Sequence, residues 1–307
     1  MKRMAIIVLL LVCFLFAGQH TTYATEGGSS YYFPGISATF APALEPHPGW
    51  LAANQMLFLG GKVDKTVLGG RVNLNVKVDA FYNYVGGFYT YDKPVMGDAK
   101  LQLGAAFAYG KVDINATANS ISRSQTGDGL GDGMISASLY WKNGNYHHKV
   151  TQSVYVPIGA YTDGKLANAG KNYWGFDTTY AMTWVNMKTG DEVSIAPGIL
   201  FNTENNSTNY KSGNEFHVDF ALNHHYFKQH YAIGVQGYYY KQLSGDSGSG
   251  ALLGSFKGEA LGIGPAILWT PPAYKGNLSV IAKWIFDVDQ EHRAKGDYGQ
   301  FIIGYKF

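Results

Sequence analysis

The side chains in this sequence that could do chemistry are two histidine pairs, one serine and a loop of alternating glycine and aspartate. His147 and His148 are neighbours in the chain, as are His224 and His225. Neighbouring residues of a β-strand face opposite sides, so neither pair can chelate one metal ion from a strand, although a turn would allow it. We therefore predict no bound metal.

Ser153 and the segment Gly127–Gly133 are the other candidates. Ser153 lacks a GxSxG elbow or any other nucleophile context. The segment Gly127–Gly133 (GDGLGDG) lacks the later oxygen ligands of an EF-hand, so we interpret it as a glycine-rich turn whose aspartates cap backbone N–H groups, and calcium binding stays open. The sequence predicts no catalytic residue, no cofactor and no enzyme activity.

The composition indicates which elements must position these residues. Of 307 residues, 46% are hydrophobic and 15% aromatic, but only 15% are charged, whereas soluble globular proteins carry about 25% charged residues. The abundance of Tyr and Phe excludes disorder, and beyond the N-terminus no apolar run reaches the ~18 residues of a membrane-spanning helix. What remains is a charge-poor, aromatic β protein.

The N-terminus predicts export. Basic residues at positions 2 and 3, an apolar run over 4–17 and a small-x-small site ending at Ala24 predict a cleaved signal peptide over 1–24. Its removal takes away the only cysteine, Cys13, and leaves 22 basic residues (24 less Lys2 and Arg3) against 22 acidic ones. This balance argues against a nucleic-acid partner.

Alternation of apolar and polar residues runs through the rest of the chain, most clearly in 71–84. Twelve segments show the length of a tilted membrane strand: 50–60, 71–84, 98–110, 132–142, 146–156, 172–185, 190–201, 214–224, 230–240, 257–269, 277–286 and 298–307. Long and short connections alternate between them. The stretch 85–97 is the exception, because it is longer than the other connections expected at the same end of the strands.

This pattern predicts an all-β fold, a closed antiparallel transmembrane β-barrel in the outer membrane of a Gram-negative bacterium. We expect about twelve strands, or fourteen if 85–97 holds two more, with long extracellular loops and short periplasmic turns. Residues 25–49 are assigned to a periplasmic N-terminal segment and 50–307 to the barrel. The oligomeric state stays open.

The polar faces of the strands are expected to line the lumen. The predicted lumen-lining residues are Asn73, Asn75, Lys77, Asp79, Asn83, Lys100, Gln102, His217, Asp219, Asn223, Gln236, Tyr238, Tyr240, Lys283 and Gln300. Two interpretations remain open: these groups satisfy one another and plug a structural barrel, or they line a narrow polar path.

The last residues form a candidate assembly signal. Phe301, Ile303, Tyr305 and the terminal Phe307 share one strand face, as in the C-terminal signal that the barrel-assembly machinery recognises. The expected partners are therefore this machinery, outer-membrane lipid and lipopolysaccharide, and a small-molecule solute.

Several motifs resemble a family of outer-membrane proteins associated with the meta-pathway of phenol degradation. They are EPHPGW at 45–50, TGDGLGD at 126–132, VPIGAY at 156–161, NAGKNYW at 168–174, NTENNSTNYKSG at 202–213 and GYYYKQ at 237–242. Most of them fall in or beside predicted long loops, which makes Gly127, Asp128, Gly131, Asp132, Pro157, Gly159, Tyr161, Tyr210 and Gly213 candidates for the channel mouth. The resemblance spans about 31–307.

The resemblance implies an outer-membrane channel for passive uptake of small hydrophobic or aromatic solutes. The alternative is a structural or adhesive barrel with a plugged lumen and partner-binding loops.

Removal of Phe307 should impair insertion into the outer membrane but leave secretion into the periplasm intact, because only the assembly signal is lost. Fractionation of cells that express the truncated chain measures this. Normal insertion of the truncated chain would contradict the assignment of Phe307 to an assembly signal.

Overall fold

The computed structural model describes residues 26–68, 71–118, 121–255 and 257–307, so the predicted signal peptide lies outside it. The strands are β1 (Gly49–Leu68), β2 (Arg71–Thr90), β3 (Lys100–Ala118), β4 (Ile121–Leu130), β5 (Gly133–Asn143), β6 (Tyr146–Val156), β7 (Gly175–Val185), β8 (Asp191–Asn202), β9 (Glu215–Tyr226), β10 (Tyr231–Gln242), β11 (Glu259–Trp269), β12 (Leu278–Glu291) and β13 (Lys295–Lys306). Three short 3₁₀ helices accompany them: η1 (Glu26–Gly28), η2 (Phe227–Gln229) and η3 (Pro272–Tyr274). In the described ranges, no helix is long and apolar enough to cross a membrane.

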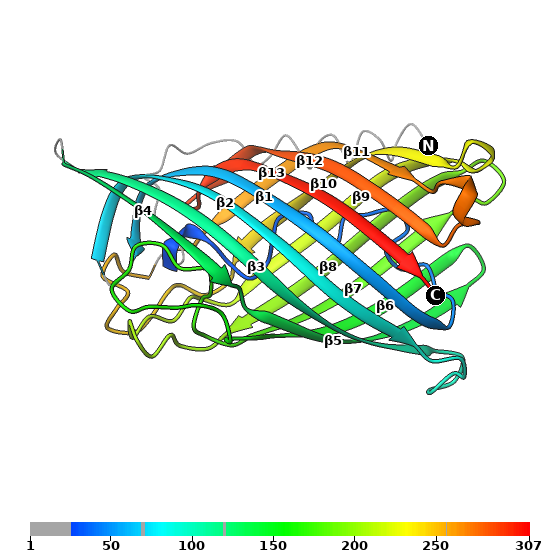
Figure 1. Cartoon of the computed structure of the whole chain (residues 1–307), viewed down its shortest axis with the longest axis horizontal. Coiled ribbons are helices and arrows are strands. Elements are labelled where there is room, and N and C mark those ends of the chain that lie inside the picture. Colours follow the sequence, from blue (N-terminus) through cyan, green and yellow to red (C-terminus); the bar gives the residue numbers. More distant parts are fainter. Residues whose placement is uncertain (1–25, 69–70, 119–120, 256) are drawn as a thin grey trace.

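Twelve of the strands close into one antiparallel barrel (Figure 1), which confirms the predicted fold class. The ring closes where β13 pairs with β1, with Lys306 opposite Leu51. Closure leaves every strand of the ring with a hydrogen-bonded neighbour on both sides, as hydrocarbon requires. Two additional strands within 85–97 are not found, because β2 continues to Thr90 and 91–99 forms the connection to β3.

The two ends of the barrel differ. One end, which we call the loop end, carries the long connections 157–174, 203–214 and 243–258 (Figure 1). The other, the turn end, carries the start of β1, the C-terminus and mostly short turns. Barrels of the outer membrane place short turns in the periplasm and long loops outside the cell.

Three predicted loops are instead largely strand. Around 61–70, 111–131 and 287–297 the chain continues as β1–β2, β3–β4 and β12–β13, so that β1 and β2 each reach 20 residues. Strand β4 is the thirteenth strand: it pairs with the loop-end half of β3, while β5 pairs with the other half. β4 and β5 are thus two pieces of one strand position, interrupted at Gly131 and Asp132.

An apolar belt surrounds the middle of the barrel. The outward side chains of Ile195, Leu222 and Ile267 are 41%, 59% and 48% exposed. Exposed apolar surface of this extent is unfavourable in water and favourable in lipid, where a charged side chain costs roughly 2 to 4 kcal/mol at the midplane. The scarcity of charge in the sequence follows from this belt.

The proposed assembly residues lie on the outer face at the turn end. Gln300 is buried in the lumen, so Phe301, Ile303, Tyr305 and Phe307 alternate to the outside; Tyr305 is 36% and Phe307 77% exposed. Their face is therefore open to an outside contact.

The orientation of the barrel can be tested with single cysteines, since the one cysteine of the sequence, Cys13, lies in the predicted signal peptide. We expect Lys77→Cys, on the outer face of β2 towards the loop end, to react in intact cells with a maleimide too large to pass porins. Lys93→Cys, exposed at the turn end, should react only after the outer membrane is permeabilised. The reverse pattern of labelling would contradict the orientation.

Candidate functional site

The lumen is filled by the N-terminal segment 26–48, which we call the plug. In Figure 1 this dark-blue segment runs inside the barrel from the loop end to the turn end. From the sequence, 25–49 is predicted to be a periplasmic segment, and a position inside the barrel is not predicted. The signal that was available is the absence of any charged residue in 27–44, which is unusual for a free polar segment.

Polar side chains of the wall hold the backbone of the plug. Lys283 Nζ donates to Gly35 O at 2.5 Å and also to Ala38 O. The remaining backbone contacts are Gln300 to Pro34 O (3.1 Å), Ser37 N to Asp219 (2.5 Å), Asn223 to Thr39 O (3.2 Å), Ala41 N to Glu192 (2.8 Å) and Ala43 N to Thr183 (3.2 Å). A buried backbone group without a partner is costly, so the wall and the plug satisfy each other.

Most of the predicted lumen residues lie on the inner face of the wall, where they contact the plug or other wall side chains. They are Lys100, Gln102, His217, Asp219, Asn223, Gln236, Tyr238, Tyr240, Lys283 and Gln300. Lys100 pairs with Glu45 at 2.6 Å near the turn end. The ring of Tyr32 stacks on His217 with centroids 4.1 Å apart, and its hydroxyl donates to Asp219.

The residues predicted on β2 require a correction. Lys77 and Asp79 point outward, are about half exposed and form an ion pair of 2.8 Å. Asn83 lies on the same outer face and accepts a hydrogen bond from Asn54. Asn73 and Asn75, near the tip of the β1–β2 hairpin, donate to backbone carbonyls there and across to β3. None of these five side chains lines the lumen.

For Lys77 and Asp79, the physical reason is that the barrel wall changes character beyond the apolar belt; Asn83 lies closer to the turn end, opposite Met56, which in turn pairs with Phe301. Towards the loop end, the inner face of β2 and β3 carries buried Val76, Val78, Val112 and Ile114, and the outer face carries charged residues. Water surrounds the outer face there, so the apolar residues turn inward. Alternation defines two faces of a strand but not which one faces inward.

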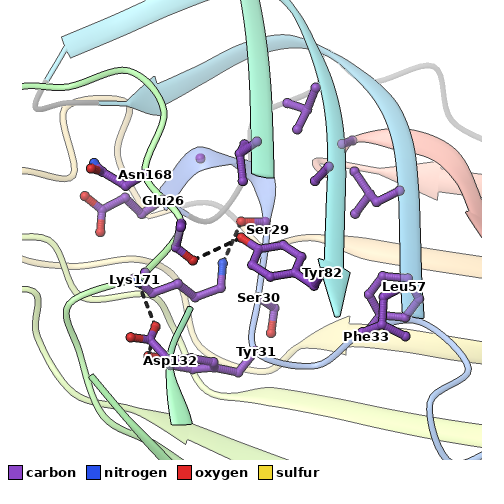
Figure 2. A pocket seen from close by; sticks show the side chains of 18 of the residues that line it. Glu26, Ser29, Ser30, Tyr31, Phe33, Leu57, Tyr82, Asp132, Asn168 and Lys171 are labelled. Atoms are coloured by element: carbon purple, nitrogen blue, oxygen red, sulfur yellow. Dashed lines mark hydrogen bonds between the residues drawn. The ribbon is translucent and has the colours of Figure 1, made fainter. Parts of the chain in front are cut away.

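This inner face lines a cavity of about 160 Å³ at the loop end, between the strands, the plug and the connection 157–174 (Figure 2). Leu57, Val78 and Ile114 form its aliphatic wall. Its aromatic lining is Tyr31, Tyr32, Phe33, Tyr82, Tyr84, Tyr161, Tyr173 and Tyr298. The cavity is suited to an apolar, ring-bearing molecule.

Asp132 joins the plug, the strand interruption and a loop. It accepts hydrogen bonds from Tyr31 Oη at 2.8 Å and Lys171 N at 2.7 Å (Figure 2), and from Gly159 N at 3.0 Å. Gly159 must be glycine, because a Cβ there would lie 2.7 Å from Gly170 Cα. The aspartate caps backbone N–H groups, as expected, but those of a distant segment.

The other predicted mouth residues interlock the loops. Pro157 begins the connection that contains Tyr161, whose hydroxyl accepts from Asn205 at 3.0 Å. Asp246 accepts from Tyr210 Oη at 2.5 Å and Gly213 N at 3.0 Å. Burial raises the pKa of Asp246. The loop end is therefore a packed, hydrogen-bonded cover.

The segment around Gly127 closes the side of this cover. A Cβ at Gly127 would lie 2.4 Å from Ala167 O, so strand β4 packs directly on the connection 157–174. Gly131 interrupts the strand position beside Asp132, and Asp128 points outward to accept from Tyr109 Oη at 3.1 Å.

The histidine pairs are split between environments. His147 is buried in the lumen, whereas His148 contacts Tyr180 on the outside. His224 pairs with Asp191 at 2.8 Å and His225 with Glu192 at 2.6 Å. Among the described residues, no group of three His, Cys, Asp or Glu side chains is suited to hold a metal ion.

The closed ring of strands, the apolar belt and the covered loop end define a β-barrel of the outer-membrane type. The family model described as "Putative MetA-pathway of phenol degradation" matches residues 61–302, so the chain belongs to this family. No curated protein matches the sequence.

One solved structure shares the fold, and a second is similar to a lesser extent. The COG4313 outer membrane channel from Pseudomonas putida F1 superposes with a TM-score of 0.66 at 13% identity, over 86% of this chain and 97% of that chain. The transport unit of the autotransporter AIDA-I from Escherichia coli gives a TM-score of 0.48 at 12% identity, over 89% of this chain and 95% of that chain. At such identities the likeness concerns the fold alone.

Replacement of Asp132 by Ala should loosen the cover, because three hydrogen bonds to a buried acceptor are lost. Each hydrogen bond is worth about 1.5 kcal/mol or more. The population of molecules in which the connection 157–174 is open should therefore increase at least about tenfold. The measurement is the rate of tryptic cleavage at Lys165 and Lys171 in isolated outer membranes. Asp128→Ala, on the outer face, is the control, and equal cleavage in both variants would contradict this role.

Proposed function

We propose that the protein is an outer-membrane channel for passive uptake of small hydrophobic or aromatic solutes. The observation that carries this proposal is the apolar, aromatic cavity at the loop end, directly above the polar lumen. The phenol-degradation description of the family supports a solute with a ring. Export through cleavage of 1–24 and insertion by the barrel-assembly machinery belong to the same proposal.

In this proposal the plug is the gate of the channel. Residues 26–48 occupy the lumen below the cavity, so a solute can pass only if the plug shifts or leaves. Side-chain hydrogen bonds, an ion pair and ring stacking hold the plug, and among the described residues no strand of the wall pairs with it. Each of these contacts can break without opening the barrel.

The alternative is a structural or adhesive barrel whose loops bind a partner. The filled lumen favours it, since a permanent plug needs no gate. The two functions predict different permeability when the plug is weakened.

Replacement of Lys283 by Met tests the gate, because it removes the donor to Gly35 O and Ala38 O. Loss of two hydrogen bonds from a charged donor should raise the population with a displaced plug at least about tenfold. Swelling of liposomes in phenol or toluene solutions should accelerate accordingly. The control is Lys77→Met, which removes an exposed cation.

A heat-modifiable mobility shift in detergent verifies that each variant forms the barrel. If folded Lys283→Met and the unmodified protein both fail to pass any solute, the channel proposal is refuted in favour of the plugged barrel.

A further inference from the structure

Three cations line the cavity: Lys165, which is exposed, and Arg293 and Lys171, which are less exposed. Arg293, in the turn between β12 and β13, is 5% exposed, and its Cζ lies 3.9 Å from the centre of the Tyr240 ring. Its Nη1 is buried and has no hydrogen-bond partner within the described ranges. Lys171 donates from Nζ to Ser29 Oγ at 2.7 Å and lies 5.9 Å from the Tyr31 ring (Figure 2).

The acids near Arg293 and Lys171 are already satisfied by neutral donors. Glu26 accepts from an amide and a hydroxyl, and Asp132 from a hydroxyl and two backbone N–H groups. Glu215 and Asp287 both interact electrostatically with Arg293. The oxygens of Glu215 accept hydrogen bonds from a serine and an asparagine, and those of Asp287 accept from two tyrosine hydroxyls and a backbone N–H group. In the part of the chain that the structure describes, no ion pair includes Arg293 or Lys171.

A buried cation is normally paired, because a buried charge without a hydrogen-bonded counter-charge is costly. The planar guanidinium fork matches a carboxylate, which can accept from both of its nitrogens. The guanidinium of Arg293 therefore has a hydrogen-bond donor, Nη1, that a carboxylate can accept from, and this donor lies at the edge of an apolar space.

The size of this space limits the rest of the ligand. A cavity of about 160 Å³ is close to the ~150 Å³ apolar cavity that accommodates benzene in another protein. One aromatic ring fits among the aliphatic and tyrosine side chains, whereas a second ring would require the cover to move.

We propose that the cavity binds a single-ring aromatic carboxylate, with the ring in the apolar part and the carboxylate on Arg293 beside Lys171. This inference rests on the proposed uptake function and names its substrate class. A neutral phenol would fill the same apolar space but leave the guanidinium charge unpaired.

Benzoate and benzamide distinguish a carboxylate site from a site for neutral rings, because they have the same shape and differ in charge at neutral pH. Binding to the purified, folded protein in detergent is measured by calorimetry for both compounds. We expect benzoate to bind at least about tenfold more tightly than benzamide, from a hydrogen-bonded charge pair. Arg293→Met should abolish this difference and leave benzamide binding unchanged.

Controls keep the two proposals separate. Lys111→Met removes a cation of the outer face and should leave the preference intact. Lys171→Met should reduce the preference, and it serves as the test if Arg293→Met does not fold. Equal binding of benzoate and benzamide to the unmodified protein would overturn the carboxylate site and leave hydrophobic uptake standing. Binding of neither compound would overturn both.

Discussion

The hydrogen bonds between the barrel wall and the plug are the interaction on which the rest of the structure depends. A closed barrel of twelve strands leaves an interior that its own side chains do not fill. Here the polar wall residues are buried because the plug backbone supplies their partners: Lys283 and Asp219 hold the stretch 35–38, and Glu192 holds Ala41. Without the plug these charged groups would face an open, wet lumen.

The plug also explains why the barrel has two zones. At the depth of the apolar belt, the wall is apolar outside and polar inside, as lipid and the plug require. Towards the loop end the strands continue into water and the pattern reverses, with Val76 and Val78 inside and Lys77 and Asp79 outside. The cavity lies where the apolar inner face meets the aromatic start of the plug, so the same strands provide both the membrane wall and one side of the cavity.

Alternation in the sequence was sufficient to predict the barrel, its strand number and the inward position of His217, Asp219 and Lys283, because their strands lie in the belt. It could not assign the faces of β2, since the same alternation occurs in lipid and in water with opposite polarity. The position of the plug could not be predicted for another reason. Its contacts join residues far apart in the chain, such as Tyr32 and Asp219, which are 187 positions apart. The role of Asp132 depends equally on segments that only the closed barrel brings together.

The central claim is that the plug must move for solutes to pass. The most direct measurement is the single-channel current of a Tyr32→Cys, His217→Cys double variant, in which a short bis-thiol reagent can tether the plug to the wall where the two rings stack. We expect current openings before tethering, their loss when the cross-link forms and their return when a cleavable cross-link is cut. Equal currents with and without the tether would contradict a gating role for the plug.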